Sequence, residues 1–145
     1  MPNDRLSAQE ALIYAMMTAS AVDRSVSLRE LERIGSMIRE LPAFKGLDHD
    51  WLAAEGQSCG RLLSTKDGLE KVLGRIAAAL PPPLRETAYV LAAEVVASDL
   101  AARPEEVHFL DLLASRLELD SEVCAALRLA ANARHRTAGT RDDGD

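Results

Sequence analysis

Apolar side chains recur at the three- and four-residue spacing of an α-helix along almost the whole chain, and no segment alternates with the period of a β-strand. Two stretches, residues 11–22 and 88–97, are apolar nearly all round. A helix that is apolar on every side must be covered by other elements. The sequence therefore predicts an all-α bundle in which these two stretches are central helices and amphipathic helices surround them.

About seven helices fit between the residues that stop or start a helix. Pro42 ends the second helix, and the triple proline at 81–83 separates the fourth from the fifth. The expected helices cover approximately 7–22, 27–41, 48–63, 65–80, 83–98, 104–118 and 120–134. Side chains suited to N-caps stand at Asp48, at Thr65, and at either Asp120 or Ser121.

The chain has the length of one domain with its own core, at 145 residues. We expect a flexible N-terminus at 1–6, a helical domain at 7–134 and a disordered tail at 135–145. Only 3% of the residues are aromatic, so alanine and aliphatic side chains must build the core. Such side chains suit closely packed helices, and alanine and leucine are the strongest helix formers.

Charge and composition argue against several classes of protein. The net charge of −6 disfavours nucleic-acid binding, which needs clustered lysine and arginine. No apolar run is long enough for a membrane span, and the N-terminus lacks the pattern of a secretory signal. Cys59 and Cys124 have no paired spacing, as is typical of reduced thiols in the cytoplasm. No catalytic motif is visible, so we expect a cytoplasmic protein that is not an enzyme.

Two pairs of acidic residues recur at one offset. Asp23 and Glu30 return 76 residues later as Asp99 and Glu106, and each pair closes one apolar helix and opens the next. The apolar positions that follow keep the same register, at Leu31/Val107, Ile34/Leu110 and Met37/Leu113. The sequence therefore predicts an internal pseudo-repeat with acidic residues at equivalent junctions.

Two interpretations account for the positions of these acidic residues, helix capping and cation binding. Ser27 and Glu30 have the S-x-x-E spacing of a capping box, and the helix dipole favours a carboxylate in the first turn. Arg103 stands at the position equivalent to Ser27 and has no acceptor, so a reciprocal box is not expected at Glu106. That difference favours a shared role for the pairs, and carboxylate oxygens suit Ca²⁺, Mg²⁺ or Mn²⁺. A metal site would need both pairs to converge: Asp23, Glu30, Asp99 and Glu106.

At these junctions the chain resembles the TerB-like tellurite-resistance family of all-helical bacterial proteins. The family pattern is an alanine-rich helix ending in Asp-Gly, an apolar residue two positions on, and then a glutamate, often found twice. The matching stretches read AVDRSVSLRELERI at 21–34 and, more loosely, ASDLAARPEEVHFL at 97–110. The resemblance implies a non-enzymatic stress-response domain that binds a divalent cation weakly through Asp23, Glu30, Asp99 and Glu106.

A second interpretation stays open, in which the chain is a structural module for protein–protein interaction or homodimerisation and binds no metal. Arg24 and Leu100 stand where the family has glycine, and the alanine-rich helices suit close packing. Glu94 is the one charge in residues 88–97. It either reaches the edge of the bundle or points inward, where it would need a partner because an unpaired buried carboxylate is costly.

Overall fold

The computed structural model describes residues 5–20, 28–39, 41–47, 50–98 and 103–138. Within these ranges all the regular structure is helical, and the chain forms a single-domain helical bundle, as the sequence predicts. The elements are α1 (Ala8–Ser20), α2 (Leu28–Ile38), the 3₁₀ helix η1 (Pro42–Phe44), α3 (Asp50–Leu63), α4 (Gly68–Ala79), α5 (Pro82–Ser98), α6 (Pro104–Arg116) and α7 (Ser121–Arg134). The ends expected to be flexible or disordered lie largely outside the described residues, at 1–4 and 139–145.

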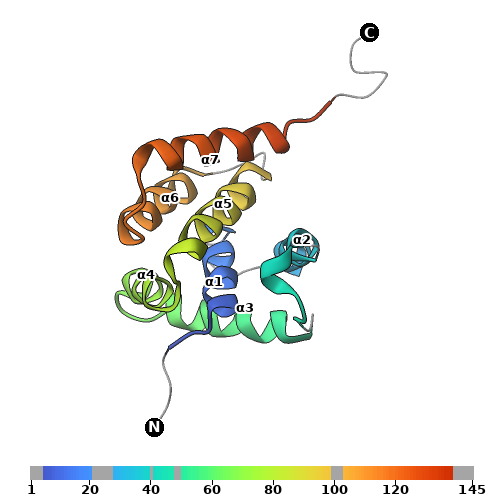
Figure 1. Cartoon of the computed structure of the whole chain (residues 1–145). Coiled ribbons are helices and arrows are strands. Elements are labelled where there is room, and N and C mark those ends of the chain that lie inside the picture. The colour runs from blue at the N-terminus through green and yellow to red at the C-terminus, as the bar shows by residue number, and fades with distance from the viewer. Residues whose placement is uncertain (1–4, 21–27, 40, 48–49, 99–102, 139–145) are drawn as a thin grey trace.

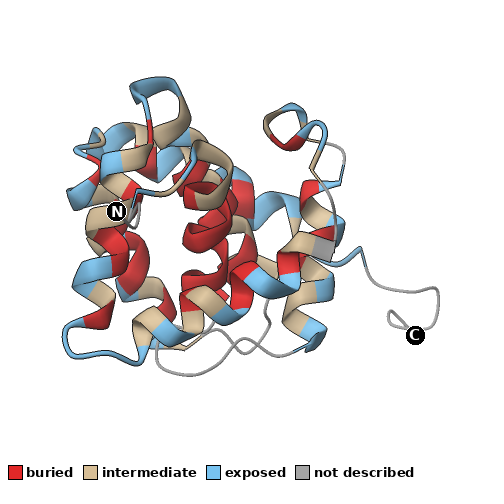
Figure 2. Ribbon diagram, turned by 90° about the horizontal axis from the view of Figure 1, so that it is seen from below, coloured by how far each residue is buried: buried red, intermediate tan, exposed pale blue. Residues whose placement is uncertain are grey.

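Helices α1 and α5 pack against each other at the centre of the bundle (Figure 1). Every residue of α1 from 11 to 20 is buried, as expected of a helix that is apolar on all sides. Helices α3 and α4 pack on α1, while α6 and α7 pack on α5. Figure 2 shows the buried residues gathered on the central helices. The prediction of two central apolar helices is confirmed.

Each central helix is followed by an amphipathic helix that packs back on it. Helix α2 contacts α1, and α6 contacts α5. This order agrees with the predicted pseudo-repeat, although the repeat itself stays a prediction from sequence. Within the described residues, no helix has both the length and the apolar character needed to cross a bilayer.

Local capping explains where α1 and α7 begin. A capping box joins Ser7 and Glu10: the Ser7 N–H donates to Glu10 Oε1 at 2.8 Å, and the Glu10 N–H donates to Ser7 Oγ at 3.0 Å. At α7, the N–H of Glu122 donates to Asp120 Oδ1 at 3.0 Å, so of the two candidates, Asp120 and Ser121, the N-cap is Asp120. The cap proposed at Asp48 lies outside the described residues.

Helix α4 begins later than predicted, and Thr65 does not cap it. The hydroxyl of Thr65 donates to the carbonyl of Leu62 at 2.6 Å, and Asp67 takes a left-handed conformation with φ of 57° before the helix starts at Gly68. The chain turns so tightly here that a Cβ on Gly68 would lie 2.3 Å from the carbonyl oxygen of Leu63. The prediction at Thr65 is wrong because the tight turn that follows α3 moves the N-cap two residues on, to Asp67.

Arg85 of α5 holds three helices together at one end of the bundle. Its guanidinium donates to the carbonyls of Ala77 at 3.1 Å, Leu80 at 3.2 Å and Leu117 at 3.1 Å. These carbonyls lie at the C-terminal ends of α4 and α6. The last carbonyls of a helix have no N–H partner within the helix itself. One side chain of α5 thus satisfies the C-terminal ends of two neighbouring helices.

Candidate functional site

The structure places two of the four predicted metal ligands, Glu30 and Glu106. Both lie in the first turn of an amphipathic helix, α2 and α6 respectively, as the sequence predicts. Asp23 and Asp99 lie outside the described residues. Convergence of the two acidic pairs, which a metal site would require, therefore concerns residues outside the described part of the chain.

Glu30 joins the start of α2 to the end of α1. Its Oε2 accepts a hydrogen bond from the hydroxyl of Ser20, the buried last residue of α1. The capping partner expected for Glu30, Ser27, lies outside the described residues. This contact fixes the relative position of two consecutive helices and uses one carboxylate oxygen in doing so.

Glu106 is almost completely buried, with 1% of its surface exposed. Its Oε1 accepts a hydrogen bond from the backbone N–H of Arg103 at 2.9 Å. This is the glutamate half of a capping box, and it needs only the backbone N–H of the N-cap residue. The expectation that capping could not account for Glu106 is therefore wrong: Arg103 has no side-chain acceptor, but its backbone N–H is a sufficient donor. Helix-start chemistry therefore accounts for the printed hydrogen bond of Glu106, at the second junction.

Among the described residues, no three histidine, cysteine, aspartate or glutamate side chains lie close enough together to hold a metal ion. Glu30 and Glu106 each have one carboxylate oxygen in a hydrogen bond at a helix start. A cation site built on these two residues would need further ligands from Asp23 and Asp99, as the sequence hypothesis states.

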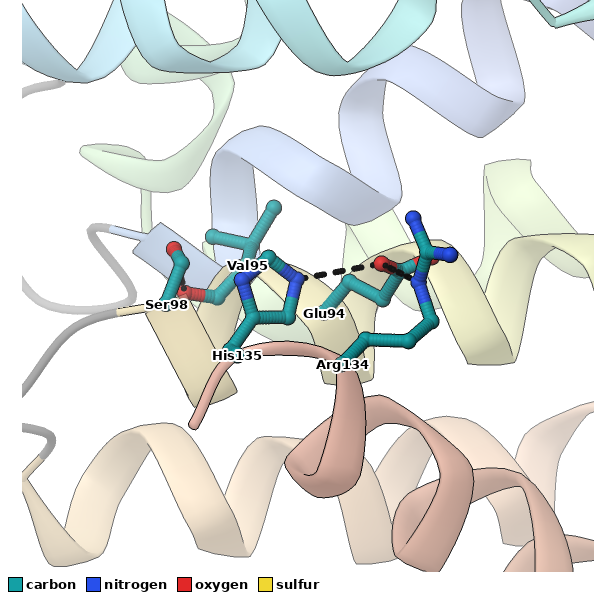
Figure 3. Close-up of polar contacts among 5 residues, drawn as sticks. All are labelled: Glu94, Val95, Ser98, Arg134 and His135. Carbon is teal, nitrogen blue, oxygen red and sulfur yellow. Dashed lines mark hydrogen bonds and ion pairs between the residues drawn. The ribbon is translucent and has the colours of Figure 1, made fainter. Parts of the chain in front are cut away.

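Glu94 is largely buried and paired, with 13% of its side chain exposed (Figure 3). Its Oε1 accepts from Nε of Arg134 at 2.7 Å and lies 3.0 Å from Nε2 of His135. Glu94 thus has a partner, and that partner is an exposed side chain, so the carboxylate lies at the edge of the bundle and not in its interior. The hydrogen bond to Glu94 and the charge of its carboxylate raise the pKa of Arg134. The contact ties the C-terminal end of α7 to the central helix α5.

A pair of carboxyl groups between α1 and α3 has no counterpart in the sequence predictions. Glu55 of α3 is only 8% exposed and hydrogen-bonds the side chain of Glu10 on α1. Burial, followed by the hydrogen bond to Glu10 and the charge of Glu10, raises the pKa of Glu55 to about 7. Its Oε1 is buried and has no hydrogen-bond partner in the described part of the chain. The pKa of Glu55 therefore lies close to neutral pH, where an ordinary glutamate is fully ionised.

The same helix pair continues inward as a polar strip. Tyr14 and Thr18 follow Glu10 at four-residue steps on α1, and Cys59 follows Glu55 at the same step on α3. The hydroxyl of Thr18 lies 3.6 Å from Sγ of Cys59. Burial raises the pKa of Cys59 to about 11 and that of Tyr14 to about 12. Cys59 is thus a protonated thiol held in the core and not a nucleophile.

A surface groove runs between α2 and α3. It consists of two hollows of about 520 and 450 Å³ that share Leu28, Leu31 and Ala53 as lining residues. Leu28 is 72% exposed although it lies at the edge of an apolar surface. We call this feature the α2–α3 groove. Its remaining lining residues are Glu32, Gly35, Arg39, Leu52, Gly56, Gln57, Gly60, Arg61 and Ser64.

Two glycines of α3 form part of the groove wall, and they differ in their surroundings. A Cβ on Gly56 would lie 3.1 Å from Cδ2 of Leu31, so internal packing restricts that position. A Cβ on Gly60 would meet nothing within 4 Å. Internal packing therefore does not require a glycine at position 60, where glycine lowers the stability of a helix.

No family model matches this chain, and no curated protein or solved structure matches it either.

Proposed function

We propose that this chain is a non-enzymatic helical domain that binds an amphipathic helix of a partner protein in the α2–α3 groove. The observation that carries the proposal is the exposure of Leu28 at the edge of that groove. Among the large hydrophobic residues that the structure describes, only Leu28 and Leu129 are exposed. Leu28 is continuous with Leu31 and Ala53 along both hollows, and contiguous apolar surface, unlike a single exposed leucine, is a feature of surfaces that a partner covers.

The shape of the groove suits a helix. Leu31 and Ala53 supply an apolar floor, and Gly60 leaves the backbone of α3 open to a close approach. Amphipathic helices bind to such grooves through an apolar stripe, whose side chains are three or four residues apart and pack into the groove. The proposal explains why glycine stands at position 60 although α3 itself would be more stable with alanine.

The charges around the groove favour an acidic partner. Arg61 lines one hollow and Arg39 lines the other, and both side chains are exposed. Glu32, also exposed, lies on the same side as Arg39. We therefore propose that the partner helix carries an apolar stripe with carboxylates toward both of its ends, because opposite charges at the rim of an interface select the partner and its orientation.

A designed peptide tests this proposal. The probe is a synthetic helix of about 14 residues with leucines at helical spacing and glutamates at both ends, and its binding is followed by fluorescence anisotropy. We expect Leu28→Asp to weaken binding by about tenfold or more, because it places a charge on the apolar contact. A peptide with lysines in place of the glutamates should also bind less tightly. Leu129→Asp, which changes the other exposed leucine, is the matched control and should leave binding unchanged.

The proposal fails if a scrambled peptide of equal composition binds equally well, or if Leu28→Asp has no effect while circular dichroism shows the same helix content. Gly60→Leu gives an independent check, since it fills the groove at a position where the fold has room for a side chain. It should block the peptide without unfolding α3.

A second candidate follows from the TerB-like resemblance: a cytoplasmic domain of the tellurite-resistance or stress-response type that binds a divalent cation weakly. The observation that supports it is the equivalent placement of Glu30 and Glu106 in the first turns of α2 and α6. The proposed ligands are Asp23, Glu30, Asp99 and Glu106. Calorimetric titration with Ca²⁺, Mg²⁺ and Mn²⁺ should give heats that disappear in Asp23→Asn/Asp99→Asn. Equal heats in both proteins would exclude cation binding at these residues.

A further inference from the structure

The larger hollow of the α2–α3 groove, of about 520 Å³, is lined on the α3 side by two glycines one helical turn apart. The chain itself fills the space over Gly56, because a Cβ there would lie 3.1 Å from Cδ2 of Leu31. The space over Gly60 is open, since a Cβ there would meet nothing within 4 Å. The backbone of α3 is therefore bare at Gly60, and a side chain of a bound helix can lie directly against it.

Ser64 presents a hydrogen-bond acceptor to the same hollow. Its N–H donates to the carbonyl of Gly60 at 3.1 Å, so the helical register continues through Ser64, one residue beyond the end of α3. Its hydroxyl donates to that carbonyl at 2.9 Å. The hydroxyl hydrogen is thus engaged, and the oxygen of this exposed side chain keeps its capacity to accept. The group that completes it is a donor.

Arg61 adds a cation to the rim of the hollow. Its side chain is exposed and lines the hollow, and its Nη2 donates to Oγ of Ser58 at 3.3 Å. A guanidinium beside an apolar surface attracts the face of an aromatic ring, and of the aromatic side chains tryptophan is attracted most strongly. The charge of Arg61 therefore favours an aromatic occupant over an aliphatic one.

We propose that the partner helix inserts a tryptophan side chain into the larger hollow, with its ring over Gly60 and its N–H donating to Oγ of Ser64. The proposal rests on the function proposed for the groove and adds the identity of the central anchor. A planar ring can lie flat on the bare backbone at Gly60. The indole N–H is a donor only, as the free acceptor of Ser64 requires. Aromatic anchors of this kind, seated in pockets, carry much of the binding energy of protein interfaces.

Three versions of the acidic helical peptide test the anchor, with leucine, phenylalanine or tryptophan at the central apolar position. Fluorescence anisotropy of a dye on the peptide gives each dissociation constant. We expect the tryptophan peptide to bind about tenfold more tightly than the leucine peptide. A leucine peptide that binds as tightly as the tryptophan peptide overturns the anchor and leaves binding in the groove in place. If none of the three peptides binds, the function proposed for the groove fails and the anchor fails with it.

Gly60→Ala places a methyl group in the space assigned to the ring. It should weaken binding of the tryptophan peptide about tenfold and that of the leucine peptide about twofold or less. Gly74→Ala, at a helical glycine of α4 that does not line the groove, is the matched control and should leave the binding of all three peptides unchanged. An equal loss for the tryptophan and leucine peptides in Gly60→Ala overturns the anchor.

Ser64→Ala tests the hydrogen bond to the indole. It should weaken binding of the tryptophan peptide about threefold to tenfold and leave the phenylalanine peptide unchanged, because phenylalanine has no donor. Equal losses for these two peptides overturn the bond to Ser64. Circular dichroism should show the same helix content in Gly60→Ala and Ser64→Ala, since the first adds a methyl group in open space and the second changes an exposed side chain.

Discussion

Oε1 of Glu94 lies 2.7 Å from Nε of Arg134, and so the one charge in the apolar part of α5 is bonded to the last turn of α7. His135 Nε2 lies 3.0 Å from the same oxygen. A carboxylate with 13% of its side chain exposed is tolerated in the apolar part of α5 because a cation next to it compensates for its loss of water. The pair joins two helices that are distant in sequence.

Removal of Glu94 should therefore weaken the bundle more than removal of an exposed ion pair does. We expect Glu94→Ala to lower the Tm by about 3–5 °C. Glu70→Ala, which breaks the exposed pair with Arg116, should lower it by about 1 °C or less, because water and side-chain entropy offset most of an exposed ion pair. Thermal unfolding followed by circular dichroism measures both. Equal shifts would show that Glu94 is no more important than a surface charge.

The raised pKa of Glu55 predicts a stability that depends on pH. The pKa of Glu55 is about 7 in the folded protein, against 4.5 for an ordinary glutamate. Between these values the folded chain holds a proton that the unfolded chain has lost. The free energy of unfolding should therefore decrease as the pH rises from about 4.5 to about 7 and then level off, by at most about 3 kcal/mol from this group.

Glu55→Gln should remove that dependence, because an amide is neutral at every pH in the range and can still donate to Glu10. The variant should be more stable than the wild type at pH 8 and close to it at pH 5. Urea unfolding at a series of pH values measures the difference. Glu86→Gln, at an exposed position on α5, is the control and should follow the wild-type curve. If the stability of Glu55→Gln changed with pH in the same way as that of the wild type, the pH dependence would not come from Glu55.

The three hydrogen bonds of Arg85 predict a large effect at one partly buried arginine. Arg85→Ala leaves the carbonyls of Ala77, Leu80 and Leu117 without that donor, and should cost about 2–3 kcal/mol in the free energy of unfolding. Arg85→Lys should fall between the wild type and Arg85→Ala, since an ammonium group cannot match the planar fork of a guanidinium. Lys71→Ala, which removes an exposed cation of α4, should change stability by less than about 0.5 kcal/mol. Chemical denaturation measures the free energy of unfolding of each variant. The account is contradicted if Arg85→Lys is as stable as the wild type, or if Arg85→Ala and Lys71→Ala lose the same free energy of unfolding.

Alanine at two glycines should have opposite effects. In Gly68→Ala the new Cβ would collide with backbone carbonyls of residues 62 and 63, which cannot move without disturbing the end of α3. We expect a loss of about 2 kcal/mol or more. Gly60→Ala should instead gain about 0.5–1 kcal/mol from helix propensity, because the added methyl meets open space. Urea unfolding tests the signs. If Gly60 serves a partner, the more stable variant should also bind the acidic peptide less well.

The helices of this protein follow from short-range physics that can be read along the chain. Apolar spacing predicts the seven helices, and the all-apolar stretches at 11–22 and 88–97 predict that α1 and α5 are central. The N-cap at Asp120 is a local interaction and is confirmed. The sequence pattern places the start of α4 too early, because the tight turn before Gly68 depends on how the chain leaves α3. It also favours a role for Glu106 other than capping, although the start of its own helix accounts for its hydrogen bond.

What the sequence alone determined, then, is which segments are helical and which two must be covered on all sides. Only the tertiary structure decided which polar groups far apart in the sequence meet. Glu94 and Arg134, or Glu10 and Glu55, are 40 and 45 positions apart and share no local pattern. Whether two such residues meet depends on where whole helices cross, which packing of apolar surfaces sets. The α2–α3 groove has the same origin: each helix buries its apolar face as far as its neighbours allow, and the surface left over is the one available to a partner.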